Sequence, residues 1–204
     1  YAVDLFIGST LQMDKDGNSS TVTRGRLAGY GGAPNMGHDP GGRRHSTPAW
    51  LNMMTADDPL ARGKKLVVQV VETFQAGNKP IFVESLDAIK VKEDTGLAIA
   101  PVMIYGDDVT HVVTEEGIAY LYKADSMEKR REAIAAVAGV TPVGLTHDPK
   151  KTDSLRREGL IALPEDLNIR RSDAKRSLLA AKSIEEIVQW SDGLYEPPAK
   201  FISW

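Results

Sequence analysis

The feature that most constrains the fold is a change of sequence pattern near Asp125. Before it, short runs rich in β-branched residues alternate with turn signals, and the strongest is Leu-Val-Val-Gln-Val-Val within residues 65–73. After it, apolar residues recur at helical spacing. The pattern predicts an α/β fold with a mainly β layer packed by helices and a helical C-terminal extension. The expected strands span residues 3–8, 65–73, 80–84, 102–105, 111–114 and 118–122.

Capping residues locate the expected helices. Ser126 precedes a helix that starts at Met127, and three more helices are expected at residues 152–158, 172–181 and 184–190. Asp173 and Ser183 are the expected caps of the last two. We therefore expect a main domain over residues 1–145 and a helical extension of the same domain over residues 146–204.

Two segments carry turn chemistry. Residues 12–18 read Gln-Met-Asp-Lys-Asp-Gly-Asn, and residues 75–79 read Gln-Ala-Gly-Asn-Lys. The second segment separates the runs at 65–73 and 80–84, so we expect these two strands to form an adjacent pair joined by this reversal.

Composition excludes several classes of function. The net charge of −3 leaves no basic excess with which to neutralise nucleic-acid phosphates. There is no cysteine, so there is no disulfide, thiolate zinc site or cysteine nucleophile, which fits a reducing cytoplasm. No apolar run approaches the roughly 20 residues that cross a bilayer. We therefore expect a cytoplasmic protein that binds neither nucleic acid nor membrane.

The segment best suited to chemistry is rich in glycine. Four glycines fall within residues 25–32, in the run Gly-Arg-Leu-Ala-Gly-Tyr-Gly-Gly. Such a backbone can approach a ligand closely, and its N–H groups suit an anion or the developing oxyanion of a thioester. The alternative is a tight structural loop. The glycine spacing matches neither a Walker loop nor a dinucleotide fingerprint, and no His/Asp/Glu cluster has metal-ligand spacing.

Three motifs in order give the first resemblance to a known family. Residues 4–8 and 11–14 (Asp-Leu-Phe-Ile-Gly and Leu-Gln-Met-Asp) are followed by Gly17-Asn18. Gly-Tyr-Gly-Gly-Ala follows at residues 29–33, and Val-Val-Thr-Glu-Glu-Gly-Ile-Ala at residues 112–119. Together they resemble the CoA-transferase superfamily, which implies a CoA-transferase-like domain.

A longer run narrows the resemblance to one subfamily. Residues 31–50 read Gly-Gly-Ala-Pro-Asn-Met-Gly-His-Asp-Pro-Gly-Gly-Arg-Arg-His-Ser-Thr-Pro-Ala-Trp and resemble the malonate decarboxylase α subunit. The resemblance extends over the whole chain to Trp204. The chain begins within an expected strand and without an initiator Met, so we expect the N-terminal half of the α subunit to be missing.

The subfamily implies an acyl-carrier-protein transferase that converts acetyl-S-carrier protein and malonate into malonyl-S-carrier protein and acetate. The implied partners are the acyl carrier protein subunit and the decarboxylase subunits of a bacterial cytoplasmic complex. No cofactor would be bound covalently to this chain, because the thiol belongs to a CoA-derived prosthetic group on the carrier protein. The resemblance places Gly31 and Gly32 at the reacting thioester. Six nearby residues would bind the substrate or thioester: Gly29, Ala33, Asn35, His38, Arg43 and Arg44.

Two mechanisms occur among the related enzymes. In one, malonate attacks the acetyl thioester directly, which requires proximity and oxyanion stabilisation. In the other, an enzyme glutamate forms a glutamyl thioester, and its motif would lie upstream of Tyr1. Glu84 resembles that motif only superficially. The glutamyl route leaves a CoA-transferase or acyl-CoA hydrolase as the alternative enzyme, and a subunit-docking module is the non-catalytic alternative.

Several charged residues have a structural and a functional interpretation. In the structural interpretation, His38, Arg43 and Arg44 belong to a solvated loop. In the functional interpretation, they form a cationic pocket that binds carboxylates or phosphates. Glu115 is expected to anchor a turn through backbone N–H groups. The run Lys-Arg-Arg at residues 129–131 is expected to form a solvated helix face. The arginine pairs at 156–157 and 170–171 would suit an acidic carrier protein, and four aromatic residues would anchor the C-terminus: Trp190, Tyr195, Phe201 and Trp204.

Overall fold

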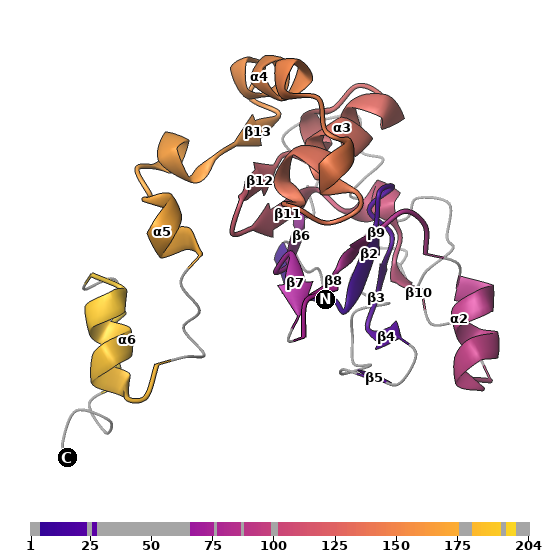
Figure 1. The fold of residues 1–204 in the computed structure, drawn as a ribbon, viewed down its shortest axis with the longest axis horizontal. Helices are drawn as coiled ribbons and strands as arrows, with labels where there is room; N and C mark the ends of the chain where they lie inside the picture. The colour runs from indigo at the N-terminus through magenta and orange to yellow at the C-terminus, as the bar shows by residue number, and fades with distance from the viewer. Residues whose placement is uncertain are drawn as a thin grey trace, which may run out of the picture. The chain divides into compact units, whose positions relative to one another are not determined.

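The computed structural model describes part of the 204-residue chain. The described residues are 5–23, 26–27, 66–75, 77–86, 88–98, 102–175, 181–192 and 195–198. The chain forms two compact units, residues 1–163 and residues 164–204. Figure 1 shows the elements of both units, and each unit is described by itself.

A five-stranded mixed sheet forms the centre of the first unit. Its three parallel strands lie side by side at one edge, and its two antiparallel strands follow. The strand order is β1 (Leu5–Gly8), β6 (Leu66–Val70), β11 (His111–Thr114), β12 (Gly117–Ala119) and β13 (Ile161–Ala162). The apolar runs of the sequence therefore build a sheet from strands that are far apart along the chain.

A second sheet and two small hairpins make up the rest of the β structure in the described residues. The second sheet has the order β10 (Val102–Ile104), β3 (Ser19–Ser20), β2 (Gln12–Asp14) and β9 (Phe82–Val83). One hairpin joins β4 (Val22–Thr23) to β5 (Arg26–Leu27), and the other joins β7 (Phe74–Gln75) to β8 (Lys79–Pro80).

The expected pairing of the runs at 65–73 and 80–84 is wrong. Strand β6 pairs with β1 and β11, whereas β9 pairs with β2 in the other sheet. The predicted reversal is present, but it joins only the two-residue strands β7 and β8, with Gly77 and Asn78 at positive φ. The chain thus passes from one sheet to the other between residues 70 and 82. Residues 12–14 of the first expected turn are also strand.

The described residues of the first unit include three α-helices: α2 (Ala88–Thr95), α3 (Met127–Val137) and α4 (Pro149–Arg157). The N-cap predicted at Ser126 is confirmed, because its hydroxyl accepts the N–H of Lys129 at 3.3 Å. Helix α4 starts earlier than expected, because the Asp148 carboxylate accepts the Lys150 N–H at 2.9 Å and Pro149 occupies the first turn. Short 3-10 helices span Gly106–Asp108, Leu121–Lys123 and Gly144–Thr146.

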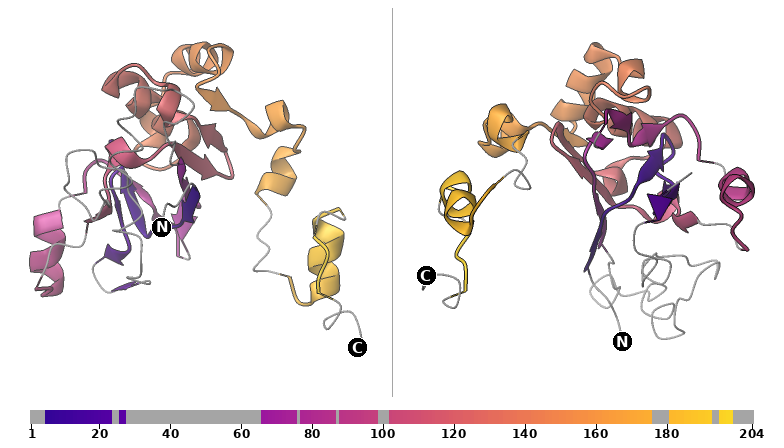
Figure 2. Two further views of the ribbon diagram at one scale, coloured as in Figure 1. Left: turned by 180° about the vertical axis from the view of Figure 1, so that it is seen from behind. Right: turned by 60° about the horizontal axis from the view of Figure 1, so that its bottom comes forward.

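The core of the first unit joins both sheets to helix α3. This helix packs against β11, β12 and α4, and Figure 2 shows α3 and α4 close together beside the sheet. The fully buried side chains come from every layer: Met13, Val67, Phe82, Ile104, Val112, Ala119, Leu121, Ile134 and Val137. The alternation of buried and exposed residues in β6 follows from burial of one face only of this sheet.

The second unit is helical in its described part. It contains a 3-10 helix at Pro164–Leu167, α5 (Arg171–Ala174) and α6 (Ile184–Trp190). The predicted N-cap Ser183 is confirmed, with its hydroxyl accepting the Glu186 N–H at 3.2 Å. Asp173 is not a cap. The N-cap of α5 is Arg170, and Asp173 lies in the first turn, paired with the Arg170 guanidinium at 2.6 Å.

These elements confirm the predicted α/β class and the helical character of the C-terminal part. Helix α4 and strand β13 pack with the first unit, since Leu155 and Ile161 join its core. The expected division of domains between residues 145 and 146 stays a prediction.

Candidate functional site

The carboxyl ends of the three parallel strands meet at one edge of the five-stranded sheet. In α/β proteins this edge is where ligands generally bind. Strand β1 is followed by Ser9 and Thr10, β6 by Glu72 and Thr73, and β11 by Glu115. Polar side chains from three distant parts of the sequence are therefore assembled at this edge.

A cavity of about 700 Å³ opens at the ends of β1 and β6. This volume lies within the usual range for sites that hold a small organic molecule or a cofactor arm. Its walls combine apolar side chains with a hydroxyl, a carboxylate and an amide, provided by Ile7, Ser9, Val70, Glu72, Gln75 and Ile81. Ser9 and Glu72 are exposed, so both can reach a ligand in this cavity.

Two polar residues of the cavity hold its wall in place. The Gln75 amide donates to the Leu11 carbonyl at 2.9 Å. The buried Thr10 hydroxyl donates to the Ser20 carbonyl at 2.6 Å. These bonds tie the segment that follows β1 to β3 and β7, so that the cavity wall is fixed by the fold.

Glu115 stabilises the neighbouring segment. Its two carboxylate oxygens accept the Thr73 N–H, each at 3.1 Å, and one of them also accepts the Thr73 hydroxyl. Gly117 closes the same turn at a φ of 151°, and a Cβ there would lie 2.5 Å from the Ala162 carbonyl oxygen. The structural interpretation of Glu115 fits this geometry, because its carboxylate fixes the chain that follows β6.

The first family-like motif also forms a structural turn. The buried Asp14 carboxylate accepts the N–H groups of Asp16 and Asn18 with one oxygen, at 3.0 and 2.9 Å. Its other oxygen accepts the Asn18 side-chain amide and the Leu86 N–H, at 3.0 and 3.2 Å. The Asn18 side-chain amide oxygen accepts the Gly106 N–H at 2.9 Å. This motif therefore joins three distant segments.

The interpretation of residues 129–131 as a solvated helix face is wrong for Arg130. Its guanidinium is half-buried and donates to the carbonyls of Leu121, Val109 and Gly106 at 2.9, 3.0 and 2.5 Å. Burial lowers the pKa of Arg130, although the nearby Asp107 and Asp108 oppose this shift. Arg130 thus joins the 3-10 helix at Gly106–Asp108 to the one at Leu121–Lys123. A run of three basic residues could not distinguish this inward position from its solvated neighbours.

Those neighbours form ion pairs at the surface. Lys129 pairs with Asp125 and Glu158, both at 3.0 Å, and Arg131 pairs with Asp16 at 2.5 Å. The hydrogen bond that Lys129 donates to the Glu158 carboxylate is the main reason that the pKa of Lys129 is raised.

A second cavity, of about 540 Å³, lies between α3, α4 and the turn after β2. Its cations are paired with carboxylates, Lys15 with Glu84 at 2.8 Å and Lys151 with Glu132. Such compensated charge makes this cavity a weaker candidate for an anionic substrate. Glu84 lies here, exposed and after β9, away from the lining of the larger cavity.

The predicted site residues fall outside the described part of the chain. These are Gly29, Gly31, Gly32, Ala33, Asn35, His38, Arg43 and Arg44. Their roles stay predictions. Sequence reasoning missed Ser9 and Glu72, although a polar residue directly after an apolar strand is a usable signal once the strand is known to be parallel.

The described residues contain no group of three or more His, Cys, Asp or Glu side chains arranged to hold a metal ion. None of their helices is long and apolar enough to cross a membrane.

Comparison with known proteins agrees with the fold and adds the family. The family model "Malonate decarboxylase, alpha subunit, transporter" matches residues 1–204. A protein of Malonomonas rubra named acetyl-S-ACP:malonate ACP transferase is 56% identical over 211 residues, covering 100% of this chain and 38% of that protein.

Two solved structures are also similar. One is a Pseudomonas malonate decarboxylase hetero-tetramer in complex with malonate, with 73% identity and a TM-score of 0.71 over 100% of this chain and 37% of that one. The other is the malonate decarboxylase α subunit of Acinetobacter baumannii, with 69% identity and a TM-score of 0.70 over 98% and 38%. The chain spans about two-fifths of the length of these relatives. It belongs to the malonate decarboxylase α-subunit family, as its sequence motifs predict.

Proposed function

We propose that this chain is part of an acetyl-S-ACP:malonate ACP transferase that works within malonate decarboxylase. One observation carries the proposal: the whole chain aligns at 56% identity with a protein of that name. The proposed partners are the acyl carrier protein and the decarboxylase subunits, and the proposed location is the bacterial cytoplasm. The reactive thiol would belong to the CoA-derived prosthetic group of the carrier protein.

The proposed reaction exchanges one acyl group for another on the same thiol. A malonate carboxylate oxygen attacks the acetyl thioester carbonyl, the carbon–sulfur bond breaks, and the carrier thiolate leaves. The thiolate then attacks the malonyl carbonyl of the mixed anhydride, and acetate leaves. This route needs no redox partner and no metal, but it requires reactants held close together and donors for each oxyanion. Gly31 and Gly32 are the proposed donors, and Arg43 and Arg44 the proposed partners of the malonate carboxylates.

The cavity at the carboxyl ends of β1 and β6 is the proposed place for the thioester arm. Its volume of about 700 Å³ suits a flexible arm that carries a small acyl group. Glu72 is the acidic residue in its lining and is exposed. Glu72 is therefore the residue in this lining that could act as the nucleophile of a glutamyl mechanism. In the direct route, Glu72 has no covalent role.

Thioester exchange tests the function. The complete α subunit is mixed with acetyl-S-carrier protein and carbon-labelled malonate, and labelled malonyl-S-carrier protein is measured by mass spectrometry. We expect exchange, and we expect Gly32→Val to slow it by about 100-fold or more, because the added branched side chain would keep the thioester away from the backbone N–H groups, and loss of an oxyanion donor has effects of that size. Absence of exchange in the complete subunit, with carrier protein and malonate intact, would refute the transferase.

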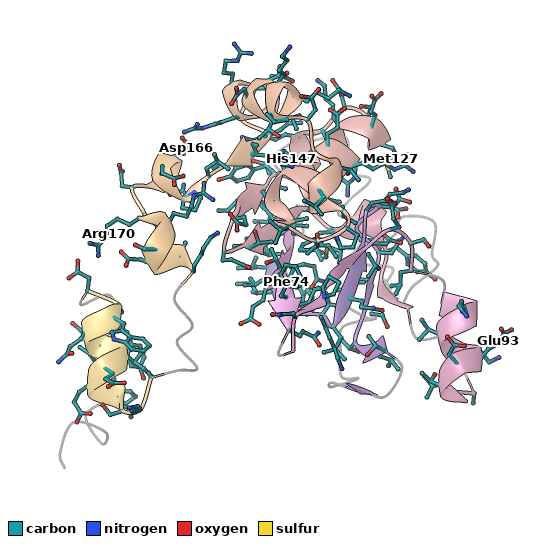
Figure 3. All side chains as sticks on the ribbon, in the orientation of Figure 1. Phe74, Glu93, Met127, His147, Asp166 and Arg170 are labelled. Carbon is teal, nitrogen blue, oxygen red and sulfur yellow. The ribbon has the colours of Figure 1, made fainter. Side chains whose placement is uncertain are left out.

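A pair of glutamate variants tests whether Glu72 itself is the nucleophile of a glutamyl route. Glu72→Gln is compared with Glu93→Gln, whose side chain points away from α2 into solvent (Figure 3). The direct route predicts that both variants keep exchange within about threefold of the parent, since neither carboxylate reacts. Loss of exchange in Glu72→Gln alone, together with a borohydride-trapped adduct on Glu72 in the parent, would replace the direct route with the glutamyl one.

A further inference from the structure

The two faces of the five-stranded sheet differ in burial. In β6, Val67 and Gln69 point into the core and are 0% and 1% exposed. The alternate residues of the same strand, Leu66 and Val70, are 38% and 45% exposed. Since successive side chains of a strand point to opposite faces, one face is packed and the other lies open.

The strand register extends this open face across the neighbouring strands. Leu5 pairs with Leu66 and Ile7 with Val68, and these two β1 side chains are 50% and 61% exposed. On the other side of β6, Val70 pairs with Val113, which is half-buried. We use the term open face for the side chains of Leu5, Ile7, Leu66, Val68, Val70 and Val113. All six are aliphatic.

An aromatic cluster continues the open face at the start of β11. His111 pairs with Val68, so it lies on the same face. Its ring centroid is 5.6 Å from that of Tyr120 and 5.1 Å from that of Tyr122. Tyrosine rings beside aliphatic side chains are common where two protein surfaces meet.

An apolar face that the described residues leave exposed is unusual for strands of this kind. Parallel strands occur almost entirely in sheets covered on both faces, and contiguous exposed apolar patches usually mark interfaces. Here the parallel strands β1 and β6 form the most exposed part of the sheet. The aliphatic character of all six open-face positions indicates an apolar covering layer, because a charged partner would find no counter-charge there.

We propose that the open face is covered, in the longer polypeptide, by an apolar layer contributed by residues beyond these 204. The relatives supply the length that this needs, because this chain accounts for only 37–38% of them. Strand β1 is the edge strand of the sheet within the described part of the chain, so further strands can pair with β1. The covering layer can then be connected to those strands. The occupant is part of the same polypeptide, neither a second copy nor another subunit.

The layer would also close the candidate site. Ile7 and Val70 belong to the open face and line the cavity of about 700 Å³. A layer resting on these two side chains forms the missing wall of that cavity. Burial and strand register alone indicate this layer, so its presence does not depend on the proposed transfer reaction.

Thiol labelling tests this proposal cleanly, because the 204 residues contain no cysteine. Ile7→Cys and Val70→Cys place thiols on the open face. Val140→Cys and Leu145→Cys are matched controls, since each of these residues is 70% exposed and lies outside the strands of the sheet. A neutral maleimide is applied to the complete polypeptide and to the 204-residue chain, and labelling of each peptide is followed by mass spectrometry. Circular dichroism confirms that each variant is folded.

We expect the two open-face thiols to react at least about tenfold more slowly in the complete polypeptide than in the 204-residue chain, because covered positions react only through local opening. The control thiols should react equally in both. Equal rates for the open-face thiols in both proteins would overturn the proposal.

Three other outcomes would also overturn it, each by naming a different cover. Protection that grows with concentration of the 204-residue chain would indicate a second copy. Protection of the complete polypeptide only after addition of the other subunits would indicate a partner chain. Protection already present in the 204-residue chain at every concentration would show that this segment covers its own face.

Discussion

The turn at residues 14–18 and the turn at residues 114–117 each depend on a carboxylate, but the two carboxylates act differently. Asp14 is 3% exposed and satisfies four donors, three of them in its own turn. Glu115 is half-buried and reaches out of its turn to hold Thr73 beside the candidate cavity. The difference shows that conspicuous acidic residues in family-like motifs can serve the architecture of a site without touching the substrate.

Close packing around the first turn predicts the largest effect. A Cβ on Gly106 would lie 1.8 Å from the carbonyl oxygen of Asp16, so Gly106→Ala must displace backbone. We expect the free energy of unfolding to fall by about 3 kcal/mol. The matched control is Gly77→Ala, where φ is +79° but nothing lies within 4 Å, and about 1 kcal/mol is expected. Urea unfolding measures both, and equal losses would show that the contact with Asp16 is not tight.

Removal of the buried carboxylate is the next largest change. Asp14→Ala leaves the N–H groups of Asn18 and Leu86 without their acceptor, and we expect a loss of about 2–3 kcal/mol in the free energy of unfolding. Asp16→Ala removes only a partly exposed ion pair with Arg131 and should change stability by less than about 1 kcal/mol. If both variants unfold at the same urea concentration, Asp14 does not organise this turn.

A smaller effect is expected in the second turn. Glu115→Gln keeps one oxygen acceptor for Thr73 but loses the charge, so the free energy of unfolding should fall by about 1 kcal/mol. A double-mutant cycle with Thr73→Val isolates the contact between the two side chains. Additive effects of the two substitutions would show that Glu115 acts on something other than Thr73.

The smallest effect concerns pH at the opposite end of β11. Burial, followed by the charge of Lys123, lowers the pKa of His111 below the usual value of about 6.5. The unfolded chain therefore takes up this proton first, so the contribution of His111 to stability is complete above about pH 6.5 and is lost as the pH falls from there through the folded pKa. Because His111 is partly exposed, the loss should stay below about 1 kcal/mol.

Urea unfolding at several pH values between 5 and 8 measures this slope, and His111→Gln should reduce it. A slope that is unchanged in the variant would assign the pH dependence to other groups.

Local signals predicted local structure well. Ser126 and Ser183 are followed directly by helical spacing, and both are N-caps of helices that begin one residue later. Helix α2 was missed because its sequence, Ala-Ile-Lys-Val-Lys-Glu-Asp-Thr, carries few apolar residues and no clear cap. Strand pairing could not be predicted from local signals. Gln69 of β6 pairs with Gly8 on one side and with Val112 on the other, and both partners are far from Gln69 along the chain, so no turn motif indicates these pairings.

The candidate site was harder to predict for the same reason. Glu72 and Ser9 come together only because β1 and β6 are parallel neighbours, a fact that neither segment carries by itself. Arg130 was misjudged because the carbonyls that it satisfies belong to loops 9–24 residues earlier in the chain. The glycine-rich run was recognisable from sequence, and its roles await the thioester exchange experiment.

The separation of β1 from β6 along the chain has a kinetic consequence. Leu5 must find Leu66 across a long intervening segment, whereas β11, β12 and α3 are contiguous and make mostly local contacts. Pairings between distant segments require a large loss of chain entropy before any stabilising contact forms, so they are slow. The hairpin of β11 and β12 with α3 is therefore expected to form the folding nucleus, and β1 to join the sheet late.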